Sequence, residues 1–574
     1  MKNVQKVSLI SNWKLIEVMS ALLFLVAPMY YHPNIGGLGF GIPNNITVWI
    51  VVTVIIFLSI KHVIDCKIIV VPKYFLLLFS LPFFLSAAEL FHGYQNLESF
   101  YLRLFTLLGG VLFLLGLLQY QFNQNKLDRL FFVFVISAFI QGIIGLSQEW
   151  LSTHELFWAV SSEQGYIAGL FQQVNNQAVY QSTAILVSFF LVQRPFFKTT
   201  GFLGILSLFF AVTFSSYIVM LSGSRAGLFS LMIGLSILVP KLLLDSKKSK
   251  NILFLLLIAT VIGFSYASFD NGGENKALEK LRTIKSGYSG AARLGIYSLT
   301  SDLITKQPIT GYGVGSFGRE FQLARPDFYE QNPDGILPET YVDHPHNEFL
   351  FWLVEGGVIS LLGLFVFIYA VLLSLFKMRE RKGLIYFSLL APILLHTQVE
   401  LPFYSSALMW FSFLLLLLPI FSNNQKIIKF GLSLQLSKFI QLILLLFFIL
   451  INLFYFHAIK SNSELNMFYQ KRSIDFNYAS VNPIFKSDVS WLLHRTYTSA
   501  LLEGDEVDSE SINKLIDWNL YNINLRPDID LYKDLISLYF LNQDIAKACK
   551  QLTITNNIYP KPKVFNQKDE YYCQ

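Results

Sequence analysis

The sequence predicts an all-α polytopic membrane protein, and three observations lead to that fold class. Hydrophobic residues make up 53% of the 574 residues and charged residues only 14%, whereas a soluble domain has about 25% charged residues. Apolar runs of about 17–25 residues, long enough to cross a bilayer as helices, recur along the chain. Lys and Arg gather in alternate short loops between these runs, as they do in multi-pass proteins.

About thirteen apolar runs are predicted to span the membrane as helices. They cover residues 15–31, 46–61, 71–89, 100–120, 130–149, 177–193, 201–221, 226–244, 251–269, 348–376, 384–400, 406–421 and 437–457. The first run is too long for the apolar core of a signal peptide and lacks a clear cleavage site, so it is predicted to remain as the first span. An odd number of spans places the C-terminus on the opposite side of the membrane from the N-terminus.

The short loops that lack Lys and Arg are predicted to face outward, since positively charged loops stay in the cytoplasm. They are residues 31–45, 90–99, 150–176 and 400–406. The polar motifs of the chain lie in or beside outward loops, so an active site on the outer face is expected. The net charge of +6 follows the cytoplasmic loops, and no basic patch with interleaved aromatic residues indicates nucleic-acid binding.

Four parts are predicted along the chain. They are a transmembrane helical bundle at 1–269, a long outer loop with short helices at 270–345, transmembrane helices that complete the bundle at 346–459, and an outer helical-hairpin, repeat-like domain at 460–574. In the last part, amphipathic helices are expected near 464–475, 488–502, 509–523, 529–541 and 543–554. Cys549 and Cys573 lie there and could pair in an oxidising compartment or remain two free thiols.

The motif HPHNEF at residues 344–349 lies where the long outer loop returns to the membrane. His344 and His346 flank Pro345, and Asn347 can both donate and accept hydrogen bonds. An imidazole titrates near neutral pH, so a histidine here could take a proton from a hydroxyl nucleophile. Two solvated loop histidines explain the motif equally well. A metal site is a weaker alternative, because no Glu, His or Cys partner set accompanies the two histidines.

Two arginines lie among small residues, Arg225 in SGSRAG (222–227) and Arg293 in SGAARLG (289–295). Small residues allow a ligand to approach closely, and a guanidinium group matches the geometry of a phosphate. The alternative for Arg225 is an ordinary anchor at the membrane interface, and Arg293 could be an ordinary loop arginine. Similarly, Arg103 near the outer end of a span could reach the interface, whereas Glu355 within a span is costly unless it is paired.

Side-chain amides are dense in FQQVNN (171–176), which includes Gln173 and Asn175, and Tyr404 lies in the outer turn ELPFY (400–404). Amides at this density could bind sugar hydroxyls, or they could only cap the helix that follows. A tyrosine is also common at membrane interfaces. The chain has no Walker A motif, dinucleotide-binding glycine pattern, CxxC pair or HExxH motif. We therefore expect chemistry that needs no cofactor and no metal.

Taken together, these motifs resemble the bacterial O-antigen ligase / O-oligosaccharyltransferase superfamily over about residues 150–574. The resemblance rests on SGSRAG, AARLGIY (291–297), KQPITGYGVGSF (306–317) and HPHNEFLFWLVEGG (344–357). FQQVNNQAVY and ELPFY are most similar to the PglL-type protein (pilin) O-glycosylation ligases, which also have an extracytoplasmic helical C-terminal domain. The amide motif departs from the family pattern at Asn175-Asn176, which leaves Gln172 and Gln173 as alternatives for one role.

The resemblance implies a metal-independent glycosyltransferase whose donor is a glycan on undecaprenyl pyrophosphate, used at the periplasmic face of the bacterial inner membrane. His346 matches the family's catalytic histidine and would deprotonate the acceptor hydroxyl. Arg225 and Arg293 match arginines that hold the pyrophosphate. Gln173 and Tyr404 match residues required in the protein-glycosylating branch, and Asn175, His344 and Asn347 are expected to contact substrate beside them.

The function expected from this resemblance is inverting transfer of an oligosaccharide to Ser or Thr of an exported protein such as a pilin. The expected partners are the lipid-linked donor, the acceptor protein and the lipid bilayer. Two alternatives are an O-antigen ligase and an O-antigen polymerase, which act on lipid A–core or on glycan with the same donor chemistry. A transporter or flippase is less favoured, because the two halves of the chain show no repeat.

Overall fold

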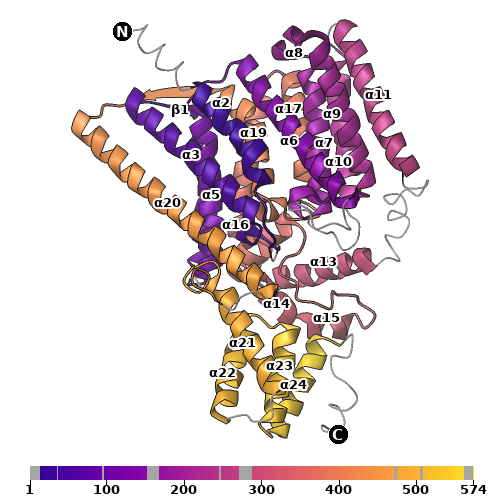
Figure 1. The fold of residues 1–574 in the computed structure, drawn as a ribbon, viewed down its shortest axis with the longest axis vertical. Helices are drawn as coiled ribbons and strands as arrows, with labels where there is room; N and C mark the ends of the chain where they lie inside the picture. Colours follow the sequence, from indigo (N-terminus) through magenta and orange to yellow (C-terminus); the bar gives the residue numbers. More distant parts are fainter. Residues whose placement is uncertain are drawn as a thin grey trace. The chain divides into compact units, whose positions relative to one another are not determined.

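The computed structural model describes residues 13–34, 36–93, 96–150, 167–244, 247–270, 288–470, 475–503, 509–560 and 573. The chain folds into two compact units, which are described separately. The first consists of Met1–Leu81, Phe105–Arg282 and Phe365–Ala479, and the second of Pro82–Leu104, Thr283–Leu364 and Ser480–Gln574. The protein is an all-α, multi-pass membrane protein in its architecture (Figure 1).

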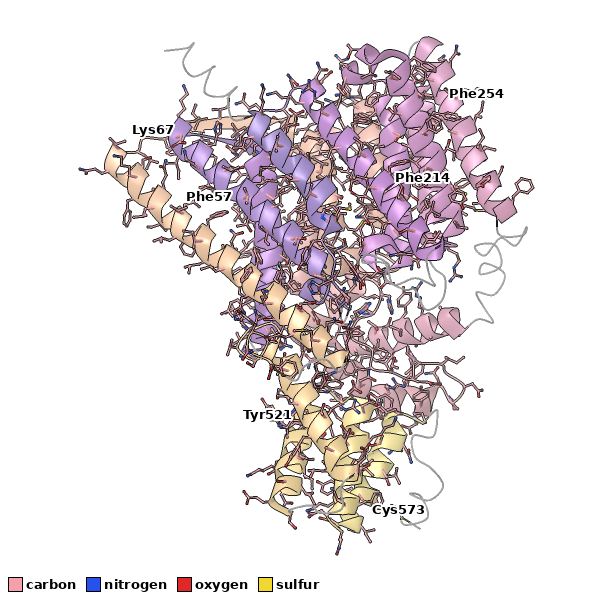
Figure 2. All side chains as sticks on the ribbon, viewed as in Figure 1. Phe57, Lys67, Phe214, Phe254, Tyr521 and Cys573 are labelled. Atoms are coloured by element: carbon pink, nitrogen blue, oxygen red, sulfur yellow. A yellow bond between two sulfur atoms is a disulfide. The ribbon has the colours of Figure 1, made fainter. Side chains whose placement is uncertain are left out.

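Within the described residues, eight helices are long and apolar enough to cross a membrane. They are α3 (Pro43–Cys66), α5 (Leu97–Leu118), α6 (Gln124–Trp150), α9 (Gly201–Leu221), α10 (Arg225–Leu242), α11 (Lys247–Asp270), α16 (Glu348–Phe376) and α20 (Leu434–Tyr469). Their exposed faces carry large apolar side chains, as Phe254 on α11 illustrates (Figure 2). Each corresponds to a span expected from the sequence. Three other expected spans are helices that are shorter or more polar, namely α7 (Val174–Leu191), α17 (Glu380–His396) and α19 (Ala407–Ser422).

The expected span at 71–89 is wrong as a single helix. Residues Ile68–Pro72 form strand β1, a 3-10 helix follows at Phe75–Phe79, and only Ser80–Glu89 forms the α-helix α4. β1 pairs with β2 (Gln425–Lys429) in an antiparallel ribbon whose register places Ile68 opposite Lys429. Lys67 and Lys73 flank β1, and Lys426 and Lys429 lie in β2. Hydropathy alone gave no sign that these two segments pair.

The first expected span, 15–31, is also interrupted. It consists of α2 (Trp13–Ala21), a π-helical turn at Leu22–Val26 and a 3-10 turn at Ala27–Met29. Pro28 lies in the last turn, and its ring nitrogen cannot donate the hydrogen bond that would continue an α-helix. The apolar run was visible in the sequence, whereas the change of helix type was not.

Within the first unit, helix α7 packs against α6, α9, α10 and α17 (Figure 1). Every residue from Asn176 to Leu191 is buried. Its polar side chains donate hydrogen bonds to neighbouring helices, as when the Gln177 amide binds the Gln141 carbonyl at 3.0 Å and the Gln181 amide binds the Ala138 carbonyl at 2.6 Å. A polar group inside a membrane bundle needs such partners, which explains why a helix of modest hydropathy occupies the core.

Small residues bring the neighbouring helices close to one another. A Cβ atom on Gly227 of α10 would lie 2.6 Å from the Ala178 Cβ of α7. Ser224 caps the N-terminus of α10, because its side chain accepts a hydrogen bond from the Gly227 backbone N–H. The small residues of SGSRAG therefore serve close helix packing as well as the start of the helix.

The second unit contains α13 (Tyr288–Lys306), α14 (Phe317–Leu323), α15 (Arg325–Gln331), the first part of α16, and the C-terminal helices. The C-terminal helices are α21 (Lys486–Glu503), α22 (Ser509–Leu525), α23 (Ile529–Leu541) and α24 (Ile545–Ile558). They share an apolar core, and α23 packs against the other three (Figure 1). The helices expected at 488–502, 509–523, 529–541 and 543–554 are confirmed. The helix expected near 464–475 is not a separate element, because residues 464–469 are the end of α20 and 471–474 lie outside the described residues. Cys549 and Cys573 form a disulfide (Figure 2 labels Cys573).

Helix α16 is broken at Gly357, whose backbone has φ 58° and ψ −162°. The break is filled by residues 308–313 of the glycine-rich segment KQPITGYGVGSF (306–317). The N–H groups of Val358 and Ile359 donate to the carbonyls of Pro308 and Ile309, and the N–H groups of Tyr312 and Gly313 donate to carbonyls on the other side of the break. The segment thus satisfies backbone groups that the interrupted helix leaves unpaired.

Two carboxylates hold the next part of the same glycine-rich segment. Glu355 accepts a hydrogen bond from the Gly315 N–H at 2.9 Å and forms a buried ion pair with Arg103. Glu89 accepts from the Val314 N–H at 2.8 Å. Glu355, whose charge within a span would be costly without a partner, is therefore paired. Its partner is Arg103, for which the sequence alone suggested only a position at the membrane interface.

The conformation at Gly357 yields a stability prediction. A Cβ atom there would overlap the Ile309 carbonyl, and the backbone angles are open almost only to glycine. Gly357→Ala should lower the free energy of unfolding by about 1–3 kcal/mol from backbone strain alone. A fall in the apparent Tm of the detergent-solubilised protein is the measurement.

The matched control is Gly431→Ala, because a Cβ atom at Gly431 meets nothing within 4 Å. Its effect should stay within about 0.5 kcal/mol. A Gly357→Ala protein that melts with the wild type would contradict the role assigned to this break.

Candidate functional site

His346 occupies a strained turn directly before α16. Its φ angle is 53°, in the left-handed region that residues with a Cβ atom rarely adopt. The following residue, Asn347, caps the helix by accepting a hydrogen bond from the Leu350 N–H at 3.0 Å. The backbone carbonyl of His346 accepts a hydrogen bond from the Tyr297 hydroxyl at 3.4 Å. Cap and tyrosine together hold the histidine in place, as is common where strain accompanies function.

Asp343 and His344 form a carboxylate–imidazole pair beside His346. The His344 Nδ1 lies 2.5 Å from an Asp343 carboxylate oxygen. A donor at Nδ1 leaves Nε2 as the acceptor atom of a neutral ring. The rings of His344 and His346 meet edge to face, with centroids 4.3 Å apart. The motif therefore has two histidines in contact, one of them oriented by an acid, and not two independently solvated side chains.

Opposing effects act on the pKa of Asp343. Burial works to raise it, whereas the hydrogen bond and charge of His344 and, more weakly, the charge of Arg526 lower it, and the net pKa lies below the usual value. The carboxylate is thus ionised near neutral pH and can orient the imidazole. Asp343 was missed by the sequence reasoning, although its place immediately before HPHN was a visible signal.

Arg293 lies on α13, the helix whose Tyr297 reaches the histidine segment. It precedes Tyr297 by four residues, or about one helical turn. Both side chains are half-buried, and Tyr297 is the residue that binds the His346 carbonyl. The second unit therefore gathers four predicted site residues, namely Arg293, His344, His346 and Asn347, around one segment. Tyr297, which the sequence reasoning did not single out, connects them.

The first unit gathers the other predicted residues around the N-termini of α7 and α10. Ser224 donates a hydrogen bond to the Asn175 side-chain oxygen at 2.7 Å, so Asn175 supports the residue that caps α10. Arg225 is the first residue of that helix and is half-buried. A helix N-terminus with a guanidinium group attracts anions through both its N–H groups and its charge.

Gln173 precedes α7, and its side chain does not cap that helix. Its side-chain oxygen is buried and has no hydrogen-bond partner among the described residues. Helix capping, the simpler explanation of the amide motif, therefore does not account for Gln173. A buried polar atom of this kind is compatible with a ligand contact.

Tyr404 belongs to the short helix α18 (Pro402–Ser405), which is tied to α7 by a buried polar network. Asn176 donates to the Ser405 hydroxyl at 2.8 Å, and its oxygen lies 3.0 Å from the His396 Nε2. The network fixes the ELPFY turn against the start of α7, and all three of its side chains are buried. The sequence reasoning missed Ser405 and His396, because their importance depends on a contact between distant segments.

Two family models match the chain. Residues 209–368 match the family described as O-Antigen ligase, and residues 384–570 match the family described as Virulence factor membrane-bound polymerase, C-terminal. No curated protein sequence matches the chain. The first match includes Arg225, Arg293 and the two histidines, and the second includes Tyr404 and the C-terminal helices. Together the matches support the O-antigen ligase superfamily and, at that level, a membrane-bound transferase of the ligase or polymerase type.

Proposed function

We propose that the protein transfers an oligosaccharide from undecaprenyl pyrophosphate to Ser or Thr hydroxyls of an exported protein such as a pilin, at the periplasmic face of the inner membrane. The observation that carries the proposal is the contact between His344 and His346, with Asp343 on one ring and the Arg293 helix held to the same segment by Tyr297. It combines a base with a phosphate-binding group within one unit of the fold.

The chemistry follows from these groups. His346 takes the proton of the acceptor hydroxyl as its oxygen attacks the anomeric carbon, and the diphosphate leaves from the opposite side, which inverts the configuration. The leaving group gains negative charge in the transition state. Arg293 stabilises that charge through guanidinium–phosphate contacts, and the resemblance implies the same role for Arg225. In this mechanism the arginines supply the charge stabilisation that a metal ion would otherwise give.

Two features support a protein acceptor. The C-terminal helices form a domain with its own apolar core, large enough to contact a folded partner. Gln173 and Tyr404, which resemble residues of the protein-glycosylating branch, lie on segments that the Asn176–Ser405 hydrogen bond joins. An O-antigen ligase or polymerase is the second candidate, because the descriptions of both matching families name such activities.

The experiment that tests the function compares cells with and without the gene. Intact-mass measurement of pilin and other exported proteins should show a glycan that disappears with the gene, and purified protein should restore it in the presence of a chelator. Loss of sugar from lipopolysaccharide alone, with unchanged exported proteins, would instead support the ligase or polymerase. Loss of transfer in the chelator would contradict the metal-independent mechanism.

The general-base assignment predicts the behaviour of His346→Ala. Donor binding and the amount of folded protein should be retained, whereas kcat should fall by about 10²–10⁴, the usual contribution of a general base. Single-turnover transfer to a peptide or protein acceptor measures kcat, and His457→Ala on α20 serves as a control histidine outside the site. If His346→Ala keeps its activity while His344→Ala loses it, the base is His344.

Activity should fall when either arginine loses its charge, and also when the charge is kept but the shape of the charged group is changed. Arg225→Ala and Arg293→Ala should each remove about 1.5–3 kcal/mol of stabilisation, or about ten- to a hundredfold in kcat/KM for the lipid donor. Lysine at either position should recover only part, because it lacks the planar fork. Arg129→Ala is the control, since Arg129 is half-exposed and pairs with Glu17. Equal effects in the control and the site variants would refute the assignment.

A further inference from the structure

The C-terminal helices contact the segment that leads to the histidines. The end of α22 and the loop that leads to α23, together residues 524–528, form the contact surface within the second unit. The Arg319 side chain donates a hydrogen bond to the Asn524 carbonyl at 2.6 Å, and the Arg526 guanidinium group lies 4.6 Å from the centre of the Tyr341 ring. Residues 319 and 341 lie on either side of α15 in the sequence, so the loop joins two parts of the 288–347 region.

A buried arginine provides a second connection. Arg325 is fully buried and donates hydrogen bonds to the carbonyls of Ile558 and Pro338, both at 2.9 Å. Its guanidinium group stacks on Tyr559, whose hydroxyl in turn donates to the Pro527 carbonyl at 2.8 Å. The end of α24, residues 524–528 and the segment before Tyr341 are therefore held in one arrangement.

Tyr341 connects these contacts to the histidines, because it lies two residues before Asp343 in the chain. Its hydroxyl packs so closely on Gly318 that a Cβ atom there would overlap it, and Arg526 covers its ring. Two residues further along the chain, Asp343 orients His344, which contacts His346. A displacement of Tyr341 would consequently move the carboxylate that fixes the first imidazole.

We propose that Arg526 and Tyr341 are positioning residues for the His344–His346 pair, so that the C-terminal helices hold the reacting segment in its working geometry. This inference rests on the proposed function and deepens it. Arg526 touches neither histidine in the described contacts and acts through Tyr341 and Asp343. The helical domain is then a part of the catalytic apparatus and not only a docking module.

Packing contributes more to this role than charge does. The Arg526 side chain is 53% exposed, so water screens its field. Asp528 pairs with Arg526 at 3.3 Å, and Asp488 is a nearby carboxyl whose pKa the arginine lowers against a larger effect of burial. The rings of Tyr341 and Trp491 also lie beside its guanidinium group. Asp343 faces His344 and, more weakly, Arg526. Loss of Arg526 should let the Tyr341 ring shift and weaken the hydrogen bond from His344 that lowers the pKa of Asp343. That pKa should then rise, and the acid limb of the activity profile should move to higher pH.

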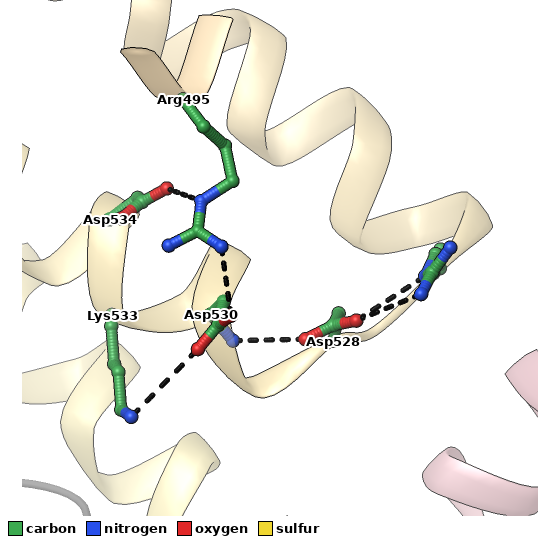
Figure 3. A network of polar contacts seen from close by, with 6 residues as sticks. Arg495, Asp528, Asp530, Lys533 and Asp534 are labelled. Carbon is green, nitrogen blue, oxygen red and sulfur yellow. Dashed lines mark hydrogen bonds and ion pairs between the residues drawn. The ribbon is translucent and has the colours of Figure 1, made fainter. Parts of the chain in front are cut away.

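The experiment uses the full-length protein and compares Arg526→Gln with Arg495→Gln. Arg495 is the matched control, because it pairs with Asp530 at 2.8 Å and Asp534 at 2.9 Å inside the C-terminal helices (Figure 3). Arg526→Gln should lower kcat at least about tenfold, a part of the usual contribution of acid–base catalysis, with an unchanged KM for the donor. Arg495→Gln should retain the wild-type kcat and pH profile even if it lowers the Tm.

Two further variants distinguish positioning from general damage. Arg526→Lys should recover most of the lost kcat, because it keeps a cation over the ring. Tyr341→Leu should resemble Arg526→Gln, and the double variant should be no slower than either single one, since both remove the same contact. Tyr341→Phe, which keeps the ring, should stay close to the wild type.

The outcomes separate the two proposals. Absence of transfer by the wild-type protein to any acceptor would overturn the proposed function and this inference with it. Wild-type transfer with an unchanged kcat and pH profile in Arg526→Gln would overturn the inference alone. An equal loss of kcat in Arg495→Gln would do the same, because the effect would then reflect a weakened helical domain.

Discussion

The break in α16 is the constraint on which the second unit depends. A membrane helix cannot leave backbone groups unpaired in an apolar environment, and at Gly357 the helix does interrupt its own ladder. The glycine-rich segment fills the gap through Val358 and Ile359, and Glu355 holds the next turn of that segment at Gly315. α14 begins directly after this turn, and the histidines lie directly before the same α16. The hydrogen bonds that pair the interrupted backbone at Gly357 thus fix the chain on both sides of the segment that carries the histidines, at α14 and at α16.

Most candidate residues have a structural contact as well as a proposed chemical role. Asn347 caps α16, Asn175 binds the serine that caps α10, and Asn176 connects α7 to Ser405 and His396. For the amide motif at 171–176, helix capping and substrate binding were competing explanations at the level of sequence. The structure makes them compatible, because a side chain locked by one hydrogen bond can present its neighbour in a defined geometry. Arg225 and His346 each directly adjoin such a locked residue.

The sequence predicted the long elements well and the contacts between them poorly. The apolar run at 348–376 coincides with α16, and α23 has the predicted bounds, because hydropathy and helical periodicity are properties of neighbouring residues. The β1–β2 ribbon and the ion pair of Arg103 with Glu355 join segments hundreds of residues apart, and nothing local specifies them. Among the site residues, the types and motifs were visible. Tyr297 gained its importance only from the fold, whereas Asp343 was adjacent to the motif and could have been recognised.

The connection between the C-terminal helices and the histidines has a consequence for how an acceptor could be used. A hydroxyl nucleophile must lie within about 3–3.5 Å of the anomeric carbon, and small errors of position are costly in rate. A docking domain on a flexible linker would raise the local concentration of acceptor without improving its alignment. Here Arg325 and Tyr559 fix the domain to the segment before Tyr341 through buried contacts. When an acceptor binds to a domain fixed in this way, part of the binding energy can hold its hydroxyl in line with the anomeric carbon. Binding then raises kcat and not only the affinity for the acceptor.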